Sequence, residues 1–265
     1  MRISSHCNRL HKAVLAVALL APLCVWAQSR SPLTGAELSG VWTWNMKAGE
    51  NPTQPLNAAA ANLPFTAEIK PRVEEYRAMA KLSLENPGSQ CVQFGMPEAM
   101  LFSGGYPMEI LQRPEQVTII FEAYSEVRRI FMEPHPYKEE DEWPSMIGFS
   151  TGHWEGETLV VHTSKLKEQL SGHFPHSEDA VIDERYHLRK LADGTPVLVN
   201  DWTLTDPKFY SAPLKRQREW KPLGKDRHLH EYACMEDRWQ AREAELLERY
   251  RSGKPVIANQ PDKKE

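Results

Sequence analysis

The stretch from Ile147 to Thr163, IGFSTGHWEGETLVVHT, constrains the fold more than any other part of the chain. It predicts a β-hairpin, because Glu155-Gly156 supplies a residue suited to the positive φ of a tight turn, and apolar or small residues alternate on both sides. Successive side chains of a strand point to opposite faces, so the hairpin has an apolar face and a polar face. The apolar face carries Ser150, Gly152, Trp154, Leu159, Val161 and Thr163. The polar face carries Thr151, His153, Glu155, Thr158, Val160 and His162. This asymmetry predicts an antiparallel sheet closed over one apolar layer.

Residues 1–27 have the pattern of a secretory signal peptide. Basic residues precede the apolar run AVLAVALLAPLCVWA, which ends in a small-residue cleavage pattern at Ala27. Cleavage as a lipoprotein at Cys24 is the alternative, and the large Leu23 before it argues against this site. No later stretch approaches the length of a membrane span, so we expect no integral membrane segment in the mature chain. The sequence therefore predicts an exported protein, either periplasmic or secreted.

The charge balance argues against nucleic acid as a partner. The chain has 32 basic and 36 acidic residues, and three of the basic ones lie in the signal peptide, which gives the mature chain a net charge of −7. A domain that binds phosphates normally presents a basic stripe, whereas the one basic cluster, Lys215-Arg216-Gln217-Arg218, is interrupted. We therefore expect no nucleic-acid partner.

Two cysteines, Cys91 and Cys234, remain after removal of the signal peptide. In an oxidising compartment such a pair predicts one disulfide, with two buried free thiols as the alternative. The bond would close a loop of about 143 residues and contribute on the order of 3–5 kcal/mol by restricting the unfolded chain.

The remaining pattern predicts a mainly β domain over residues 28–253. Short strands separated by turn signals are expected at 38–44, 108–112, 117–123, 127–133, in the hairpin, and at 181–190, 197–205, 214–220 and 228–234. Such an antiparallel meander is long enough to close into a barrel or half-barrel, and two stacked sheets are the alternative. Helices are expected at 67–84 and 236–251, and residues 254–265 at the end are expected to be a disordered tail.

Two resemblances support this interpretation. Gly40-Val41-Trp42 is similar to the Gly-x-Trp of the first lipocalin strand, which implies a barrel with its first strand tied down. Residues 127–163 resemble a large group of exported bacterial proteins of unassigned function, common in proteobacteria. The shared elements are Arg128-Arg129, His135-Pro136, the hairpin with its Gly-x-Ser-x-Gly-x-Trp-Glu-Gly pattern, and Asp206-Pro207 with Tyr210 and Pro213.

This chain departs from that pattern at Phe149, where the group often has histidine, and at His162, where it often has aspartate. The resemblance implies a class of exported protein and no particular chemistry.

The hairpin carries two candidate sites, a serine-hydrolase motif and a zinc site, and each has a simpler structural explanation. Gly148 to Gly152 formally matches the hydrolase pattern Gly-x-Ser-x-Gly, but a nucleophile elbow requires a helix directly after the strand, and this strand continues to Trp154. His153 and His162 share the polar face, yet zinc needs three or four ligands. The further histidines, His135, His173 and His176, lie in separate loops that the sequence does not bring together. We therefore expect no metal and no cofactor.

The candidate catalytic residues are Glu184, His176 and Arg128. In Asp183-Glu184-Arg185-Tyr186 and in Arg128-Arg129 successive charges point to opposite faces, so one acid and one arginine are expected inside the barrel. An internal ion pair that fixes strand register is the structural explanation. The functional explanation is an acid and a base held in an apolar pocket, with Arg128 holding an anion.

The preferred hypothesis is a barrel that binds a small apolar or aromatic molecule in its mouth. The candidate ligand-binding residues are Trp42, Trp154, Arg129, Tyr210 and Asp206. A cofactor-independent acid–base enzyme on the same scaffold, such as an isomerase, lyase or hydrolase, is the alternative. A purely structural envelope protein is the third hypothesis, and it predicts an exposed apolar patch in place of a pocket.

Overall fold

The computed structural model describes residues 35–45, 62–83, 87–101, 106–170, 173–224 and 226–254. The predicted signal peptide, 1–27, lies outside these residues, as does the predicted tail, 254–265, apart from its first residue. In the described part of the chain, no helix combines the length and the apolar character needed to cross a lipid bilayer.

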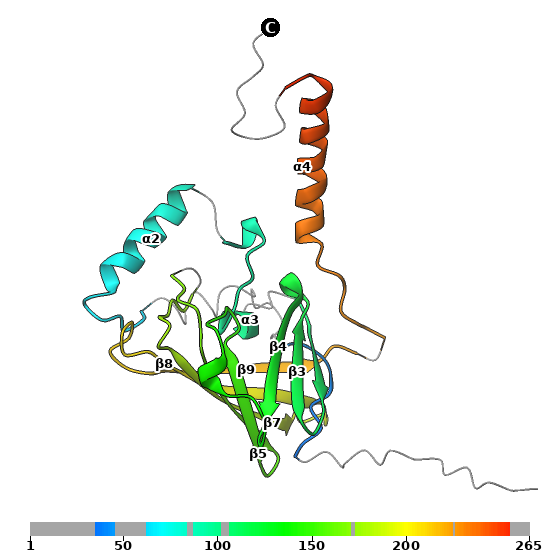
Figure 1. Cartoon of the computed structure of the whole chain (residues 1–265). Helices are drawn as coiled ribbons and strands as arrows, with labels where there is room; N and C mark the ends of the chain where they lie inside the picture. The colour runs from blue at the N-terminus through cyan, green and yellow to red at the C-terminus, as the bar shows by residue number, and fades with distance from the viewer. Residues whose placement is uncertain are drawn as a thin grey trace, which may run out of the picture. The chain divides into compact units, whose positions relative to one another are not determined.

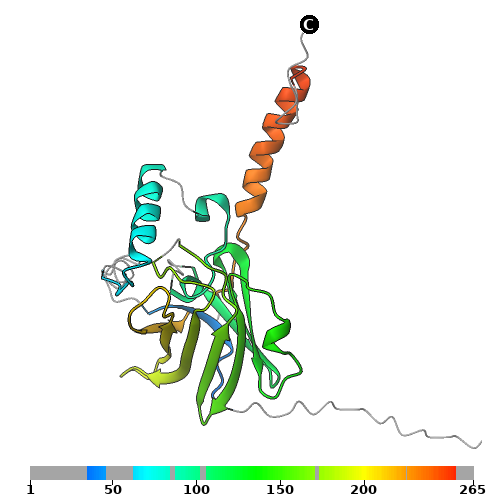
Figure 2. The ribbon, with the colours of Figure 1, turned by 60° about the vertical axis from the view of Figure 1, so that its left-hand side comes forward.

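Nine strands form one closed barrel, which confirms the predicted fold class (Figure 1, and turned by 60° in Figure 2). Each strand pairs with its neighbour in sequence, and the first strand pairs with the last. The strands are β1 (Gly40–Trp44), β2 (Met108–Gln112), β3 (Gln116–Phe121), β4 (Glu126–Met132), β5 (Phe149–Glu155), β6 (Thr158–Ser164), β7 (Val181–Lys190), β8 (Pro196–Thr205) and β9 (Leu214–Pro222). The stacked-sheet alternative is excluded, because β1 and β9 close the ring.

One pairing departs from the predicted antiparallel meander, because β4 and β5 run parallel. In a closed ring of nine strands the directions cannot alternate all the way round, so at least one neighbouring pair must be parallel. A parallel pair needs a connection that returns to the starting end of the sheet. The segment from Glu133 to Gly148 is long enough to do so, and it covers the outside of the barrel at Phe149. That side chain is buried against Phe131 and His135 and does not join the polar face.

The helices lie where the apolar period and capping signals predict two of them. The α-helices are α2 (Lys70–Ser83), α3 (Glu98–Leu101) and α4 (Cys234–Arg251), and the 3-10 helices span Pro87–Gln90, Ala123–Ser125 and Glu139–Asp141. Helix α2 buries Val73 completely. Just before the helix, the hydroxyl of Thr66 accepts a hydrogen bond from the backbone N–H of Ile69, as an N-cap residue does. Helix α3 lies among the barrel strands (Figure 1) and was not predicted from the sequence.

The predicted strand at 228–234 is wrong, because this segment has no strand pairing and leads directly into α4. The ring of Tyr232 packs on Tyr124, with centroids 4.7 Å apart, and on Tyr106, and the backbone N–H of His230 donates to Glu122 at 2.6 Å. The disulfide between Cys91 and Cys234 is present, which confirms the predicted pairing. It fastens the start of α4 to the segment that follows α2.

The central hairpin has the predicted two faces. Thr163 pairs with Ser150 and Val161 with Gly152, and these four residues are buried inside the barrel. His153 and His162 point outward and are exposed. The tight turn lies one residue later than predicted, because Glu155 already pairs with Thr158 and leaves the two residues between them as the loop.

Candidate functional site

Five consecutive strands place polar side chains inside the barrel. Each of these positions belongs to the inward set of its strand, so the alternation that buries the apolar core also buries these groups. None of them is more than 1% exposed. They are Arg128 on β4, Ser150 on β5, Thr163 on β6, Glu184 and Tyr186 on β7, and Asn200 on β8.

Arg128 is the centre of this interior network. Its Nη1 donates to Oε1 of Glu184 at 3.1 Å, and its Nη2 donates to Oε2 of the same carboxylate. Its other donors face hydroxyl groups: Nε reaches Ser150 at 3.1 Å, Nη2 reaches Thr163 at 2.7 Å, and Nη1 also lies 3.4 Å from the hydroxyl of Tyr186. Burial opposes the charged guanidinium, but the neighbouring Glu184 and Tyr186 raise the pKa of Arg128 overall. The pair is therefore a bidentate ion pair with further hydrogen bonds.

The carboxylate of Glu184 receives two more hydrogen bonds. The hydroxyl of Tyr186 donates to Oε1 at 2.8 Å, and Nδ2 of Asn200 donates to the same oxygen at 2.9 Å. Burial, followed by the charge of Glu184, raises the pKa of Tyr186, so its phenol keeps its proton. The carboxylate of Glu184 therefore accepts hydrogen bonds from three different side chains, Arg128, Tyr186 and Asn200.

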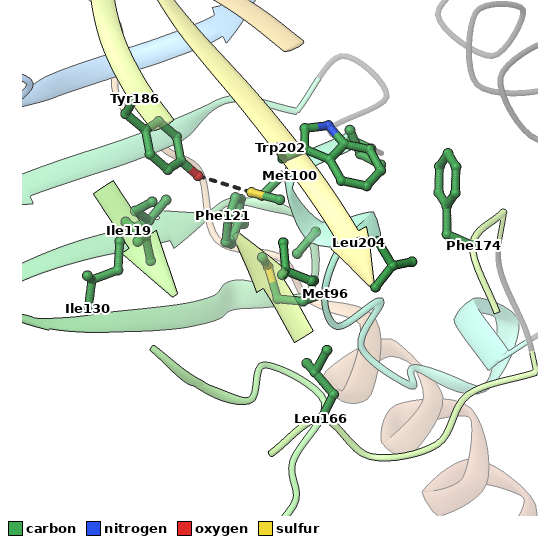
Figure 3. Close-up of a cluster of buried hydrophobic side chains, with 14 of the residues drawn as sticks. Met96, Met100, Ile119, Phe121, Ile130, Leu166, Phe174, Tyr186, Trp202 and Leu204 are labelled. Atoms are coloured by element: carbon green, nitrogen blue, oxygen red, sulfur yellow. Dashed lines mark hydrogen bonds between the residues drawn. The ribbon is translucent and has the colours of Figure 1, made fainter. Parts of the chain in front are cut away.

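The sulfur of Met100, from α3, lies against the same network. Three polar groups surround it: the hydroxyl of Tyr186 at 3.0 Å, whose single hydrogen is donated to Glu184, and Nη1 of Arg128 and Nδ2 of Asn200 at 3.4 Å each, which carry two hydrogens apiece. Figure 3 shows the first of these contacts as a dashed line. A thioether is a weak acceptor, so this environment is far more polar than a methionine requires. Two N–H donors and a hydroxyl oxygen thus converge on a position that holds a weak acceptor.

Helix α3 is held in place by two buried carboxyl groups. Oε1 of Glu98 accepts from the N–H of Phe174 at 2.8 Å, and Oε1 of Glu126 accepts from the N–H of Gly95 at 2.8 Å. The second oxygen of each has no hydrogen-bond partner among the described residues. Burial raises the pKa of Glu98 to about 8, and burial raises the pKa of Glu126 to about 7. At neutral pH each carboxyl group therefore has a substantial protonated population, which is an unusual anchor for a helix.

Aromatic side chains form the rest of the interior wall around the network. Trp220 stacks on Tyr186, with centroids 6.5 Å apart, and Trp202 meets Phe174 edge to face at 5.4 Å. In the described part of the chain, both indole N–H groups are buried without an acceptor. Oδ1 of Asn200 is buried without a donor. Buried polar atoms are nearly always hydrogen-bonded in folded proteins, so three unpaired atoms on β8 and β9 require an explanation.

The predicted pair of Glu184 and Arg128 is brought together by the structure, but His176 lies elsewhere. Nδ1 of His176 is 3.1 Å from the backbone carbonyl of Phe174, and burial lowers the pKa of its imidazole. The neighbouring Ser177 bonds to Asp206. No contact between His176 and Glu184 occurs among the described residues, so the acid–base pair of the enzyme hypothesis is not assembled.

Two more predicted residues serve the loops at the ends of the strands. The carboxylate of Asp206 accepts from the backbone and hydroxyl of Ser177 and from the N–H groups of Lys208 and Phe209, which is the pattern of a capped turn. The hydroxyl of Tyr210 donates to the carbonyl of Pro175 at 2.6 Å. Both side chains are buried and hydrogen-bonded within the protein.

The other predicted ligand-binding residues lie in different environments. Trp42 is buried and donates from its indole to the carbonyl of Leu38 at 2.9 Å, as expected for a tied-down first strand. Trp154 packs against the core while partly buried. Arg129 points to the exposed outer face of β4. Of these three, none belongs to the interior network.

The histidines of the hairpin are paired with acids on the outer surface. Nδ1 of His162 is 2.7 Å from Asp183, and Nε2 of His153 is 3.4 Å from Glu155. Within the described residues no group of three or more potential ligands is arranged to hold a metal ion. These contacts support the interpretation of His153 and His162 as surface histidines.

Two open hollows of about 580 Å³ each also lie on the outside. One runs over β7, β8 and β9 beside outward charges such as Asp183, Arg185 and Lys215. The other lies between the start of α2 and the loop around Glu178 and Asp179.

Several site residues were missed by the sequence reasoning. Met100 and Glu98 lie on a four-residue helix that has no detectable period, so nothing in the sequence marks them. Asn200 had a usable signal, because it is an inward position of a predicted strand and is the one polar residue in Val197-Leu198-Val199-Asn200. Tyr186 was also predictable as an inward neighbour of Glu184.

Comparison with known proteins gives no family assignment. No protein-family model matches the chain, and no curated protein sequence matches it at a significant level.

Proposed function

We propose that this chain is an exported β-barrel protein that binds a small, partly aromatic molecule inside the barrel, at the position now filled by Met100. The observation that carries the proposal is the convergence of the N–H donors of Arg128 and Asn200, beside the hydroxyl of Tyr186, on a thioether sulfur. The aromatic wall around it supplies the apolar contact that such ligands need. The leader at 1–27 and the Cys91–Cys234 disulfide support export, because disulfides persist in oxidising compartments.

A purely structural role accounts for only part of the network. An ion pair that fixes register needs Arg128 and Glu184 with their hydrogen bonds complete, and that condition is met. It does not require unpaired polar atoms on Asn200 and Trp202 in the same interior, because each unpaired atom lowers stability. A bound ligand that forms hydrogen bonds with Asn200 and Trp202 would account for these unpaired atoms as well as for the complete ion pair.

Binding at this position requires α3 to leave it. All four residues of α3 are buried, and the helix is too short to be stable without its tertiary contacts. It is held by Glu98 and Glu126, each with one unpaired oxygen, and by a hydrogen bond from Arg218 to the carbonyl of Leu101 at 2.8 Å. We therefore propose α3 as the movable floor of the binding site.

Two methionine variants test for a site at Met100. Met100→Ala opens space beside the network, and Met108→Ala is the matched control because Met108 is equally buried on β2, outside the network. With benzamide and toluene as probes in a thermal-shift assay, at least one is expected to raise the melting temperature of Met100→Ala clearly more than that of Met108→Ala. Equal shifts, or none in either variant, would contradict the proposal.

Hydrogen–deuterium exchange of the wild-type chain tests the movement of α3. Benzamide or toluene at a saturating concentration is expected to increase exchange at residues 95–101, because α3 must leave its position for the probe to bind. The amides of β8 are expected to stay protected. Stronger protection at 95–101 would show that the probe binds outside the barrel and leaves α3 in place.

A further inference from the structure

The interior site has no net charge to offer a ligand. Arg128 and Glu184 are both fully buried and bonded to each other. Tyr186, which also contacts the Met100 sulfur, keeps its proton because burial raises the pKa of its phenol. An anion beside Met100 would lie near the carboxylate of Glu184, and a cation would lie near the guanidinium of Arg128. Transfer of an uncompensated charge into such an interior is strongly unfavourable. The site therefore selects an uncharged polar group.

Hydrogens on Arg128 and Asn200 are available at this position. Nη1 of Arg128 and Nδ2 of Asn200 carry two hydrogens each. One hydrogen of each nitrogen serves Oε1 of Glu184, and each nitrogen also lies 3.4 Å from the Met100 sulfur. The second hydrogen of Nη1 is shared between that sulfur and the hydroxyl of Tyr186, also 3.4 Å away. An oxygen acceptor in place of the sulfur would form stronger bonds with both. The ligand group therefore contains an acceptor oxygen such as a carbonyl.

The unpaired Oδ1 of Asn200 requires a donor beside that carbonyl. The orientation of this amide is determined by its neighbour, because the reverse orientation would place Oδ1 against the carboxylate of Glu184. Oδ1 is fully buried and has no partner among the described residues. A ligand N–H adjacent to the acceptor oxygen would satisfy it.

The aromatic wall requires a flat body on the ligand. The rings of Trp220 and Tyr186 are nearly parallel, with an interplanar angle of 23°, and Trp202 on β8 lies on the strand between theirs. Flat rings pack against such side chains in stacked or edge-to-face geometry.

We propose that the ligand is an uncharged planar molecule that carries an adjacent C=O and N–H pair, that is, an aromatic carboxamide or a lactam. The carbonyl replaces the Met100 sulfur against Arg128 and Asn200, and the N–H pairs with Oδ1 of Asn200. This inference rests on the proposed function, since it specifies the chemistry of the same binding site.

Four probes of matched shape test the inference on the Met100→Ala variant. Benzamide carries the C=O and the N–H, acetophenone the C=O alone, toluene neither, and benzoate a negative charge. Dissociation constants from calorimetry at pH 7 are expected to rise in the order benzamide, acetophenone, toluene, with about a five- to tenfold change for each hydrogen bond lost. Benzoate is expected to bind at least tenfold more weakly than benzamide.

Each outcome separates the two proposals. If toluene binds as tightly as benzamide, the site exists but has no amide preference, and this inference is overturned while the proposed function stands. If benzoate binds most tightly, the site is an anion site, and the inference is again overturned. If none of the four binds more tightly to Met100→Ala than to Met108→Ala, the proposed function itself fails.

Discussion

Two arginine–glutamate pairs lie on opposite faces of the same barrel wall, one buried inside the barrel and one exposed to solvent outside it. Glu184 points inward to Arg128, and the next residue, Arg185, points outward to Glu155 at 2.7 Å. The outer pair is about half exposed, whereas the inner pair is fully buried. The outer pair competes with water and is screened by salt, so it contributes little. The inner pair has lost its hydration and depends on protein hydrogen bonds, which the surrounding hydroxyl, phenol and amide groups supply.

This difference in exposure determines how strictly each polar atom must be hydrogen-bonded within the protein. Outside the barrel a charge can be placed at any outward position, because water solvates it. Inside, each polar atom must be paired or it lowers stability, and most of the network is paired. Among the exceptions in the described part of the chain, Asn200 and the two indoles lie beside the proposed ligand position or on its walls, and Glu98 and Glu126 hold α3. The predictions below test this contrast from the largest effect to the smallest.

The largest effect is expected for Arg128→Met. It leaves the carboxylate of Glu184 buried without its counter-ion, which typically costs about 3–5 kcal/mol of unfolding free energy. Urea denaturation followed by tryptophan fluorescence measures the loss. The double variant Arg128→Met/Glu184→Leu should recover most of it, because no unpaired charge remains. A single variant as stable as the wild type would show that water reaches Glu184 in the folded protein.

A second effect is a loss of stability as the pH rises. The folded chain binds the protons of Glu98 and Glu126 more tightly than the unfolded chain does, because burial raises their pKa values from 4.5 to about 8 and about 7. Their contribution is complete below about pH 4.5 and is lost as the pH rises through about 7 and 8, by on the order of a few kcal/mol.

The isosteric variant Glu98→Gln separates the two contributions to this pH dependence. Its amide oxygen can still accept from Phe174, so the helix contact is kept while the titration is removed. Denaturation midpoints measured from pH 5 to pH 9 should fall less steeply in Glu98→Gln than in the wild type. Parallel curves would mean that Glu98 does not hold its proton in the folded state.

The sequence was sufficient to predict the features that depend on strand alternation. Alternation alone places Glu184 inward and Arg185 outward, and it places the two hairpin faces correctly. The disulfide was predictable because Cys91 and Cys234 are the two cysteines that follow the predicted signal peptide, so no choice of pairing remains. Strand alternation is a local property, and two cysteines can pair in one way, so these features can be predicted without knowledge of the closed barrel.

The sequence was insufficient for the features that depend on closure. The contact of Met100 with Asn200 joins residues 100 positions apart through a helix of four residues, and so short an element has no period to detect. A parallel pair is required by the odd number of strands in the closed barrel, and that number is odd because 228–234 is not a strand. The position of this pair, between β4 and β5, depends on the connection from Glu133 to Gly148. His176 was placed with Glu184 by residue chemistry alone, and the loop that carries it folds beside Asp206.

A third, smaller effect distinguishes two glycines of the hairpin. A Cβ at Gly152, inside the barrel, would lie 2.8 Å from Ile130 Cγ2 and 3.2 Å from the carbonyl of Val160. Gly152→Ala is therefore expected to cost about 1–3 kcal/mol by overpacking. At Gly156, in the outer turn, a Cβ meets nothing within 4 Å, and only the positive φ of 61° disfavours alanine. Gly156→Ala should cost about 1 kcal/mol; equal losses would show that the interior yields easily at Gly152.

The smallest effect is expected for the outer pair, through Arg185→Met. The hydrogen bond from Arg185 lowers the pKa of Glu155, so the pair favours the folded state above the ordinary pKa of a glutamate and loses that contribution as the pH falls through the lowered value. Because both side chains are half exposed, we expect no resolvable change in the denaturation midpoint at pH 7. An NMR titration should nevertheless show the pKa of Glu155 rising toward its ordinary value in the variant. A loss of stability comparable to that of Arg128→Met would contradict the contrast between the two faces, since an ion pair in water would then hold the barrel as firmly as a buried one.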